Sequence, residues 1–106
     1  MDLSPHVSCL TKEIATLCDP EKIYLFNAKR SLAGNVTSFK LCIIADTESK
    51  AALERRIYLE LDCEIPYDLV LYTPNEWGEF LQKPHSFAGE IKEKGVLLYD
   101  KAQTSE

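Results

Sequence analysis

The sequence has no uninterrupted apolar stretch close to the roughly 20 residues that a membrane-spanning helix needs. Residues 1–5 contain neither a basic cluster nor an apolar run, so we expect no signal peptide. Basic residues are too few for a protein that coats nucleic acid, because 12 lysines and arginines are outnumbered by 17 acidic residues. These absences predict a cytoplasmic protein that does not enter membranes and has at most a small local basic site.

Cysteine pairs at metal-binding or redox spacing are also missing. The four cysteines are scattered along the chain, and no two of them have the C-x-x-C spacing of a zinc knuckle or a redox motif. We therefore expect free thiols that pack as small hydrophobic side chains. Repeats, linkers and low-complexity segments are absent as well, so residues 1–106 are expected to form a single domain.

The chain does contain alternating helix and strand patterns. Hydrophobic periodicity, proline positions and capping residues predict elements in this order: a helix over 5–18 capped by Ser4, strands over 23–26 and 37–45, a helix over 47–61, a strand over 67–73, a helix from 74, a short helix stopped by Gly95, and a strand over 96–99. Residues 27–35 are predicted to form a loop or short helix, and residues 101–106 a frayed tail. This order predicts a mixed α/β or α+β domain with a sheet of about four strands. The first two strands should pair antiparallel, and later strands separated by helices should run parallel.

Two patterns predict where side chains point. In the second strand, alternation places two sets on opposite faces: Phe39, Leu41 and Ile43 on one, and Ser38, Lys40, Cys42 and Ile44 on the other. Near the C-terminus, three large aromatic residues recur at helical spacing and are predicted to be core: Trp77, Phe80 and Phe87.

Several of these segments together resemble a known family. Residues 23–26 (IYLF), a polar turn and residues 37–44 (TSFKLCII) resemble the core of the minimal nucleotidyltransferases, small relatives of the DNA polymerase beta catalytic domain. Residues 66–74 (PYDLVLYTP) are similar to the family's third conserved strand and the helix start after it, and residues 87–99 to its usual ending. The resemblance covers about residues 22–99 and implies a nucleotidyltransferase fold.

The family's catalytic carboxylates are mostly replaced in this chain. Members hold divalent ions with an Asp-x-Asp pair on the second strand and a third carboxylate on the third strand, and these ions bridge the triphosphate and activate the attacking hydroxyl. The resemblance places Ser38 and Lys40 at the pair and keeps only Asp68. Shifting the alignment by one residue would instead place Phe39 and Leu41 at the pair. We therefore expect a degenerate site at Ser38, Lys40 and Asp68, without a metal.

Lys40 has two alternative interpretations. If the family's geometry holds, Lys40 faces Asp68 and the two form a structural salt bridge. Alternatively, Lys40 belongs to a small cationic pocket that binds a nucleotide phosphate without metal. That pocket would be formed by Asn27 and Ala28, which replace the family's phosphate-approaching Gly-Ser, together with Lys29, Arg30 and Lys40.

The resemblance thus predicts a catalytically inactive domain, without a cofactor, that binds a protein or associates with itself. Family members of this length work beside a separately encoded helical protein, as in toxin–antitoxin pairs, so such a partner or a homo-oligomer is implied. Trp77 and Tyr58 are candidate contacts. Two alternatives stay open: an active nucleotidyltransferase with a rebuilt metal site that uses Mg²⁺ and a nucleoside triphosphate, or metal-free binding of nucleotide or nucleic acid at the basic pocket.

Overall fold

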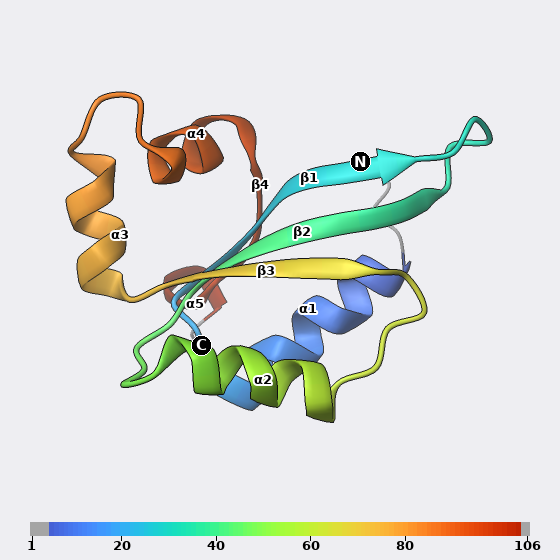
Figure 1. Cartoon of the computed structure of the whole chain (residues 1–106), viewed down its shortest axis with the longest axis horizontal. Helices are drawn as coiled ribbons and strands as arrows, with labels where there is room; N and C mark the ends of the chain where they lie inside the picture. Colours follow the sequence, from blue (N-terminus) through green and yellow to red (C-terminus); the bar gives the residue numbers. More distant parts are fainter. Residues whose placement is uncertain (1–4, 105–106) are drawn as a thin grey trace.

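The computed structural model describes residues 5–104 of the chain (Figure 1). Its helices and strands are α1 (Pro5–Cys18), β1 (Lys22–Arg30), β2 (Val36–Ile44), α2 (Lys50–Glu60), β3 (Tyr67–Tyr72), α3 (Pro74–Leu81), α4 (Phe87–Lys94), β4 (Val96–Asp100) and α5 (Lys101–Thr104). The predicted order of elements is confirmed, with α5 added at the end. None of the helices in this described part is both long and apolar enough to cross a bilayer.

The four strands form one mixed sheet in the order β3-β2-β1-β4. β1 pairs antiparallel with β2 on one side and with β4 on the other, whereas β3 pairs parallel with β2. Consequently β2, β3 and β4 run in one direction and β1 alone runs in the other. The predicted α+β class is confirmed, and so are the antiparallel pairing of the first two strands and the parallel pairing after the first crossover helix.

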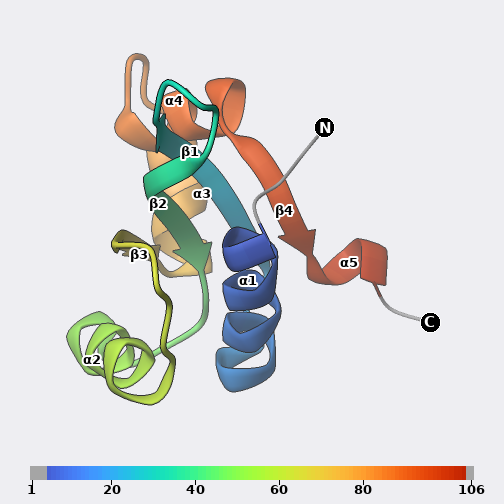
Figure 2. The ribbon, with the colours of Figure 1, turned by 90° about the vertical axis from the view of Figure 1, so that its right-hand side faces the viewer.

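The helices cover the two faces of the sheet unequally. In both ribbon views α1 and α2 lie together on one side of the sheet, and α3 and α4 lie on the other side near one end of the strands (Figures 1 and 2). Phe39, Leu41 and Ile43 of β2 are buried on the α1 and α2 side. Cys42 and Ile44 are buried against α3 and α4. The predicted alternation along β2 is therefore confirmed.

The prediction of a loop or short helix over residues 27–35 is wrong for its first half, because β1 continues to Arg30 and forms a hairpin with β2. The hairpin tip, residues 31–35, is a tight turn in which the Ser31 N–H donates to the Asn35 carbonyl at 2.8 Å. Gly34 has a φ of +90°, which glycine adopts without steric cost. Pairing with β2 organises a segment whose own composition carries little strand signal.

The predicted frayed tail is also wrong where the structure describes it. Residues 101–104 form α5, and the Lys101 ammonium lies 2.8 Å from an Asp19 carboxylate oxygen. The Lys101 N–H donates to the Glu21 carbonyl at 2.9 Å, which ties this helix to the start of β1. These partners are distant in sequence, so local composition carried no signal for them. Residues 105–106 and the predicted cap Ser4 lie outside the described residues.

The predicted helix ends are mostly correct. Thr73 and Glu76 form the predicted capping box at the start of α3. α2 begins three residues later than predicted, because Ser49 caps it by accepting a hydrogen bond from the Ala52 N–H at 3.1 Å. Gly95 ends α4 as predicted: a Cβ there would lie 2.5 Å from the Ile91 carbonyl oxygen, so only glycine permits this close approach.

The aromatic core prediction is correct for Trp77 and wrong for Phe87. Trp77 is 6% exposed, and Phe80 is half-buried beside it. Phe87 is 50% exposed, because it begins α4 at the rim of the helix pair, where its ring and that of Phe26 form a T-shaped pair at a centroid distance of 5.5 Å. The spacing of the aromatic residues indicated helices, but not that Phe87 would begin a second helix at the margin of the sheet.

Candidate functional site

A hollow of about 290 Å³ opens over β1, β2 and β3. We call it the charged hollow, and its lining residues are Asn27, Lys29, Ser38, Phe39, Lys40, Pro66, Tyr67 and Asp68. Ser38 and Lys40 alternate with Phe39 and Leu41 on β2, so they lie on the same face as the residues that α3 and α4 cover. The structure therefore brings together five of the residues that the sequence singled out: Asn27, Lys29, Ser38, Lys40 and Asp68.

Strand register places these residues opposite one another. Lys40 pairs with Asp68 across the parallel β2 and β3 ladder. On the other side, Asn27 pairs with Lys40 and Lys29 pairs with Ser38 across the antiparallel ladder. Because directly opposed residues present their side chains on the same face, the prediction that Lys40 and Asp68 are neighbours on adjacent strands is confirmed.

The register also weighs against the alternative alignment. Phe39 and Leu41 are 1% and 0% exposed and belong to the core on the α1 and α2 side. Phe39 also lines the charged hollow, but its side chain and that of Leu41 are packed in that core and carry no group that could bind a metal or a phosphate. Ser38 and Lys40 are thus the β2 residues available to stand beside Asp68.

A bulge in β1 decides which of its residues reach the hollow. The pairing with β2 shifts by one residue between Leu25 and Asn27. Leu25 is buried on the α1 and α2 side, and regular alternation would turn Asn27 to that side as well. The bulge moves Asn27 and Lys29 to the face of Lys40 instead. Nothing in the sequence marked this position.

The predicted salt bridge between Lys40 and Asp68 is not formed. None of the ion pairs found between described residues joins them, although their strands are neighbours. Lys40 is half-buried and Asp68 is exposed. An ion pair at such an exposed site gains little free energy over separate hydration of the two charges. The hollow therefore holds two ammonium groups, of Lys29 and Lys40, and the Asp68 carboxylate, which forms none of the ion pairs found between described residues.

Two members of the predicted cationic pocket lie elsewhere. Ala28 packs against the core on the α1 and α2 side. The Arg30 guanidinium donates to the Gly34 carbonyl oxygen at 3.2 Å and so belongs to the hairpin turn. Within residues 5–104, no group of three or more histidine, cysteine or acidic side chains is arranged to hold a metal ion. Asp68 is the one acidic residue that lines the charged hollow.

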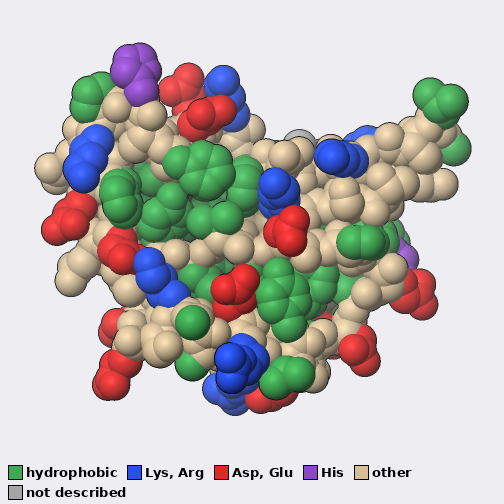
Figure 3. All heavy atoms as spheres, in the orientation of Figure 1, with side chains coloured by type: hydrophobic (Ala, Val, Ile, Leu, Met, Phe, Trp, Pro, Cys, Tyr) green, Lys and Arg blue, Asp and Glu red, His purple; other side chains and the backbone are tan. Residues whose placement is uncertain are grey.

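An aromatic surface that the sequence analysis missed lies on the same face as the hollow. We call it the aromatic patch and define it by Phe26, Tyr72, Phe80 and Phe87. Phe26 meets Phe87 edge-on, and the Tyr72 and Phe80 ring centroids are 5.7 Å apart. Hydrophobic side chains gather visibly between α3, α4 and the strands (Figure 3). The signal that could have found it is the run of aromatic residues at strand ends and helix starts.

Of the two aromatic residues proposed as contacts, only Tyr58 is accessible. Trp77 lies beneath the aromatic patch, where it contacts Tyr24 and Tyr72 at ring-centroid distances of 5.5 and 5.4 Å. Tyr58 is 40% exposed on α2 and stacks on Tyr67, one of the residues that line the charged hollow. Trp77 therefore supports the patch from below and is excluded as a direct contact.

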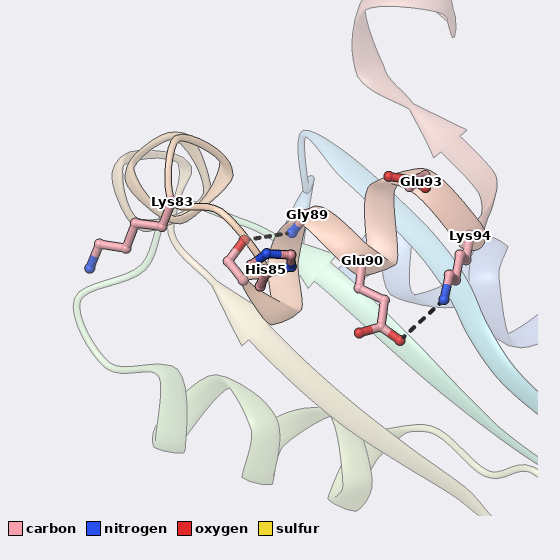
Figure 4. Close-up of a pocket in the computed structure, with 7 residues that line it drawn as sticks. Lys83, His85, Gly89, Glu90, Glu93 and Lys94 are labelled. Carbon is pink, nitrogen blue, oxygen red and sulfur yellow. Dashed lines mark hydrogen bonds and ion pairs between the residues drawn. The ribbon is translucent and has the colours of Figure 1, made fainter.

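A second hollow, of about 320 Å³, lies at the loop between α3 and α4 (Figure 4). Its loop side is formed around Ser86, which caps α4 by accepting from the Gly89 N–H at 2.9 Å. Glu90 is 3.9 Å from the Lys94 ammonium along α4. Lys83 extends away from this hollow in the figure and lies over the Phe80 ring. This region holds none of the predicted site residues, so the charged hollow is the candidate site.

Comparison with known proteins adds no relative. Neither a scan against protein-family models nor a search of curated proteins finds a match for this sequence. A function is therefore inferred from the chemistry of the charged hollow and the aromatic patch.

Proposed function

We propose that this protein is a catalytically inactive nucleotidyltransferase-like domain whose partly uncovered sheet face binds a protein. The observation that carries the proposal is the convergence of Ser38, Lys40 and Asp68 in one hollow. Their strand positions are those that the family resemblance assigns to the three metal-binding carboxylates. The resemblance and the register thus support the same alignment, and in that alignment two of the three carboxylates are replaced.

The replacement by Lys40 opposes metal binding as well as removing a ligand. An ammonium about 4 Å from a divalent cation is repelled by about 8 kcal/mol at an effective dielectric constant near 20. Lys29 brings a second ammonium into the same hollow. Asp68 alone does not offset this repulsion, so the chain is expected to lack the metal-assisted transfer of the family.

Support for protein binding comes from the surface beside the hollow. Phe87 is half-exposed, and three further aromatic side chains of the patch are only half-buried. Aromatic residues are enriched in protein interfaces, where they bury a large area at little cost in conformational entropy. A separately encoded helical protein or a second copy of the chain are the two classes of partner that the resemblance implies.

The catalytic half of the proposal is tested by incubating the protein with α-labelled ATP and Mg²⁺. We expect no transfer of label to the chain or to added protein or nucleic-acid acceptors, and no magnesium-dependent rise in the melting temperature. Label transfer that requires Mg²⁺ would overturn the proposal in favour of an enzyme with a rebuilt metal site.

A matched pair of variants tests the alignment itself. The double variant Ser38→Asp, Lys40→Asp adds two carboxylates beside Asp68 and should gain a Mn²⁺- or Mg²⁺-dependent rise in melting temperature. Adding Asp68→Asn to that variant should remove most of the gain, because the third ligand is lost. If the double variant gains nothing, the three positions do not share the geometry of a metal site.

The same hollow favours a second candidate function, metal-free binding of a nucleotide phosphate. Lys29 and Lys40 both line it, and an ammonium group forms charge-assisted hydrogen bonds with phosphate oxygens. Asp68 weighs against this function because it repels the same phosphate. Stabilisation by ATP alone, abolished by Lys40→Ala and unaffected by Lys12→Ala on α1, would replace protein binding with this function.

A further inference from the structure

β4 is an edge strand with one unpaired side. Within residues 5–104 it pairs with β1 on one side, and the sheet has no strand on its other side. Figure 2 shows β4 at the margin of the sheet opposite α2. Edge strands present N–H and C=O groups that an added strand can bind. The edge of β4 is therefore a template for main-chain pairing with another extended chain.

The register shows that polar backbone groups of β4 point outward at this edge. Lys22 of β1 lies opposite Asp100 of β4. The neighbouring hydrogen bond runs from the Lys101 N–H to the Glu21 carbonyl at 2.9 Å, one residue beyond that pair on each strand. This is the pattern around a non-hydrogen-bonded pair of an antiparallel ladder. The N–H and C=O of Asp100 therefore point away from β1, toward the side without a strand.

A groove of about 490 Å³ lies beside this edge, between β4 and α1. Leu98 and Tyr99 form its strand wall, and five residues between Ser8 and Thr16 form its helix wall. Residues 8–16 span about 12 Å along the helix, since each residue adds about 1.5 Å. That length matches roughly four residues of an extended chain. The groove therefore has room for a short strand alongside β4.

The helix wall of the groove leaves space for side chains. Val7, Leu10 and Ile14 of α1 are buried in the core. The flank of the helix at the groove carries two short side chains, those of Ser8 and Ala15. Alternate residues of an added strand would point their side chains toward this flank. Small or β-branched apolar side chains would fit there.

The charge of the groove selects among possible occupants. Two of its hydroxyl groups are bonded within α1: Thr11 donates to the Val7 carbonyl at 2.8 Å, and Thr16 to the Lys12 carbonyl at 3.1 Å. Lys12 is the one charged residue that lines the groove, and it belongs to none of the ion pairs found between described residues. An ammonium group there attracts an acidic side chain. The groove thus favours an occupant that combines small apolar side chains with a carboxylate.

We propose that the edge of β4 binds an extended segment of another protein, which adds a fifth strand to the sheet. Alternate side chains of that segment enter the groove against Ser8 and Ala15, and an acidic side chain of the segment reaches Lys12. α5 begins at Lys101 and limits the added strand at that end. This surface is separate from the charged hollow, because β3 and β4 are opposite edges of the sheet. It does not depend on the proposed function.

A foreign segment suits the groove better than a second copy of the chain. In a dimer joined through β4, the side chains offered to each groove would come from the β4 strand of the other copy. Leu98 and Tyr99 of that strand already pack against the core of their own copy. They cannot fill a second groove at the same time. A segment that is extended and otherwise unpacked brings side chains that have no such contacts.

The first experiment selects peptides from a phage-displayed library of random dodecapeptides against the wild-type protein. Enriched sequences should carry small or β-branched residues at alternate positions and an aspartate or glutamate. Ser8→Phe fills the groove and should weaken binding of the synthetic peptide roughly tenfold or more, measured by fluorescence anisotropy. Cys9→Phe is the matched control, because Cys9 is exposed on α1 and does not line the groove. This variant should bind like the wild type.

The second experiment tests the main-chain pairing directly. N-methylation of the selected peptide at alternate residues removes the N–H groups along one edge of its strand. The set that faces β4 should weaken binding roughly tenfold or more, because backbone hydrogen bonds are lost. The other set faces away from β4 and should leave the affinity nearly unchanged. A difference between the two sets is specific to strand addition.

The third experiment exchanges the charges. Lys12→Glu should weaken binding of the acidic peptide roughly tenfold, because attraction is replaced by repulsion. A peptide with lysine in place of its acidic residue should recover the lost affinity on that variant. Circular dichroism and melting temperature verify that every variant is folded.

The outcomes bear on this proposal alone. Absence of any enriched sequence, binding unaffected by Ser8→Phe, or equal effects of the two N-methylated sets would each overturn the added strand. A wild-type protein that sediments as a dimer and dissociates when the peptide binds would make a second copy the natural occupant of the edge, against the proposal. None of these measurements concerns the charged hollow or catalysis, so the proposed function stands or fails separately.

Discussion

The two faces of the sheet differ in how completely they are covered. On the α1 and α2 side, Phe39, Leu41 and Ile43 are fully buried in an aliphatic cluster. On the opposite side, α3 and α4 bury Cys42 and Ile44, while Lys40 and Ser38 of the same strand remain partly in water. One face therefore supplies the closed core of the fold, and the other leaves part of its length uncovered by helices.

This division has an energetic consequence. Each large side chain buried on the closed face contributes about 1.5–3 kcal/mol relative to exposure, so substitutions there act on folding. Polar residues at the uncovered end lose little hydration and make few packing contacts. Their identities are therefore free to change the surface chemistry without unfolding the domain. That freedom is consistent with Lys40 standing where the family resemblance expects a carboxylate.

The largest contrast between the faces should appear in a pair of phenylalanine substitutions. Phe39→Ala should lower the free energy of unfolding by about 3–5 kcal/mol, because Phe39 is fully buried and stacks on Tyr67. Phe87→Ala, at the half-exposed rim, should cost about 1 kcal/mol. Urea denaturation measures both. Equal losses would show that the two faces contribute equally to the core.

Gly95 tests how tightly α4 is joined to the sheet. Gly95→Ala should destabilise the fold by about 1–3 kcal/mol, because the added methyl group meets the Ile91 carbonyl oxygen at 2.5 Å and the Leu25 carbonyl oxygen at 3.1 Å. Gly78→Ala in α3 is the matched control: its Cβ enters open space and should stabilise the helix by up to about 1 kcal/mol. A neutral Gly95→Ala would mean that α4 moves freely relative to β1.

A smaller, pH-dependent effect is expected at the α3 cap. Hydrogen bonds from the Lys50 ammonium and the Thr73 backbone N–H lower the pKa of Glu76 below its usual value. A carboxyl group with a lowered folded-state pKa stabilises the fold above its unfolded pKa, and that contribution is lost as the pH falls through the folded pKa. Glu76→Gln should therefore lower the melting temperature at neutral pH and have no such effect in strong acid. A deficit independent of pH would contradict this assignment.

The smallest expected effect is a difference in thiol reactivity, which measures how well α3 and α4 shield their side of the sheet from solvent. Cys42 is fully buried there, and burial raises the pKa of its thiol to about 12, whereas Cys9 on α1 is exposed. A thiol-reactive reagent at neutral pH should modify Cys9 rapidly and Cys42 only after unfolding. Mass spectrometry of the labelled peptides identifies both sites without any substitution. Rapid labelling of Cys42 in the folded protein would mean that α3 and α4 open readily.

Much of the fold was predictable because its signals are local. The helical spacing of Val7, Leu10 and Ile14 requires only neighbours along the chain, and all three are buried in α1 as that pattern predicts. The Thr73 and Glu76 capping box is likewise a relation between residues three apart. Where the partners are distant the predictions were wrong: pairing with β2 extends β1 to Arg30, and Asp19 anchors α5 through Lys101.

The candidate site, too, was predictable where its signals are local and not where they depend on residues distant in sequence. Alternation along β2 and the family resemblance pointed to Ser38, Lys40 and Asp68, and the parallel register does bring Lys40 beside Asp68. The expected salt bridge did not form, because both side chains reach water. The aromatic patch was not predicted, because Phe26 and Phe87 are far apart in sequence and come into contact only when α4 packs on β1.

By itself the sequence determined the periodic elements and their order, because each follows from residues close together along the chain, and the family resemblance directed attention to Ser38 and Lys40. Only the tertiary structure decided which of these residues share a surface. The β1 bulge turns Asn27 and Lys29 toward Lys40, and the unequal cover by α3 and α4 leaves that surface open beside the aromatic patch. Bulges and helix placement arise from packing between distant segments, and such packing has no signature in local composition.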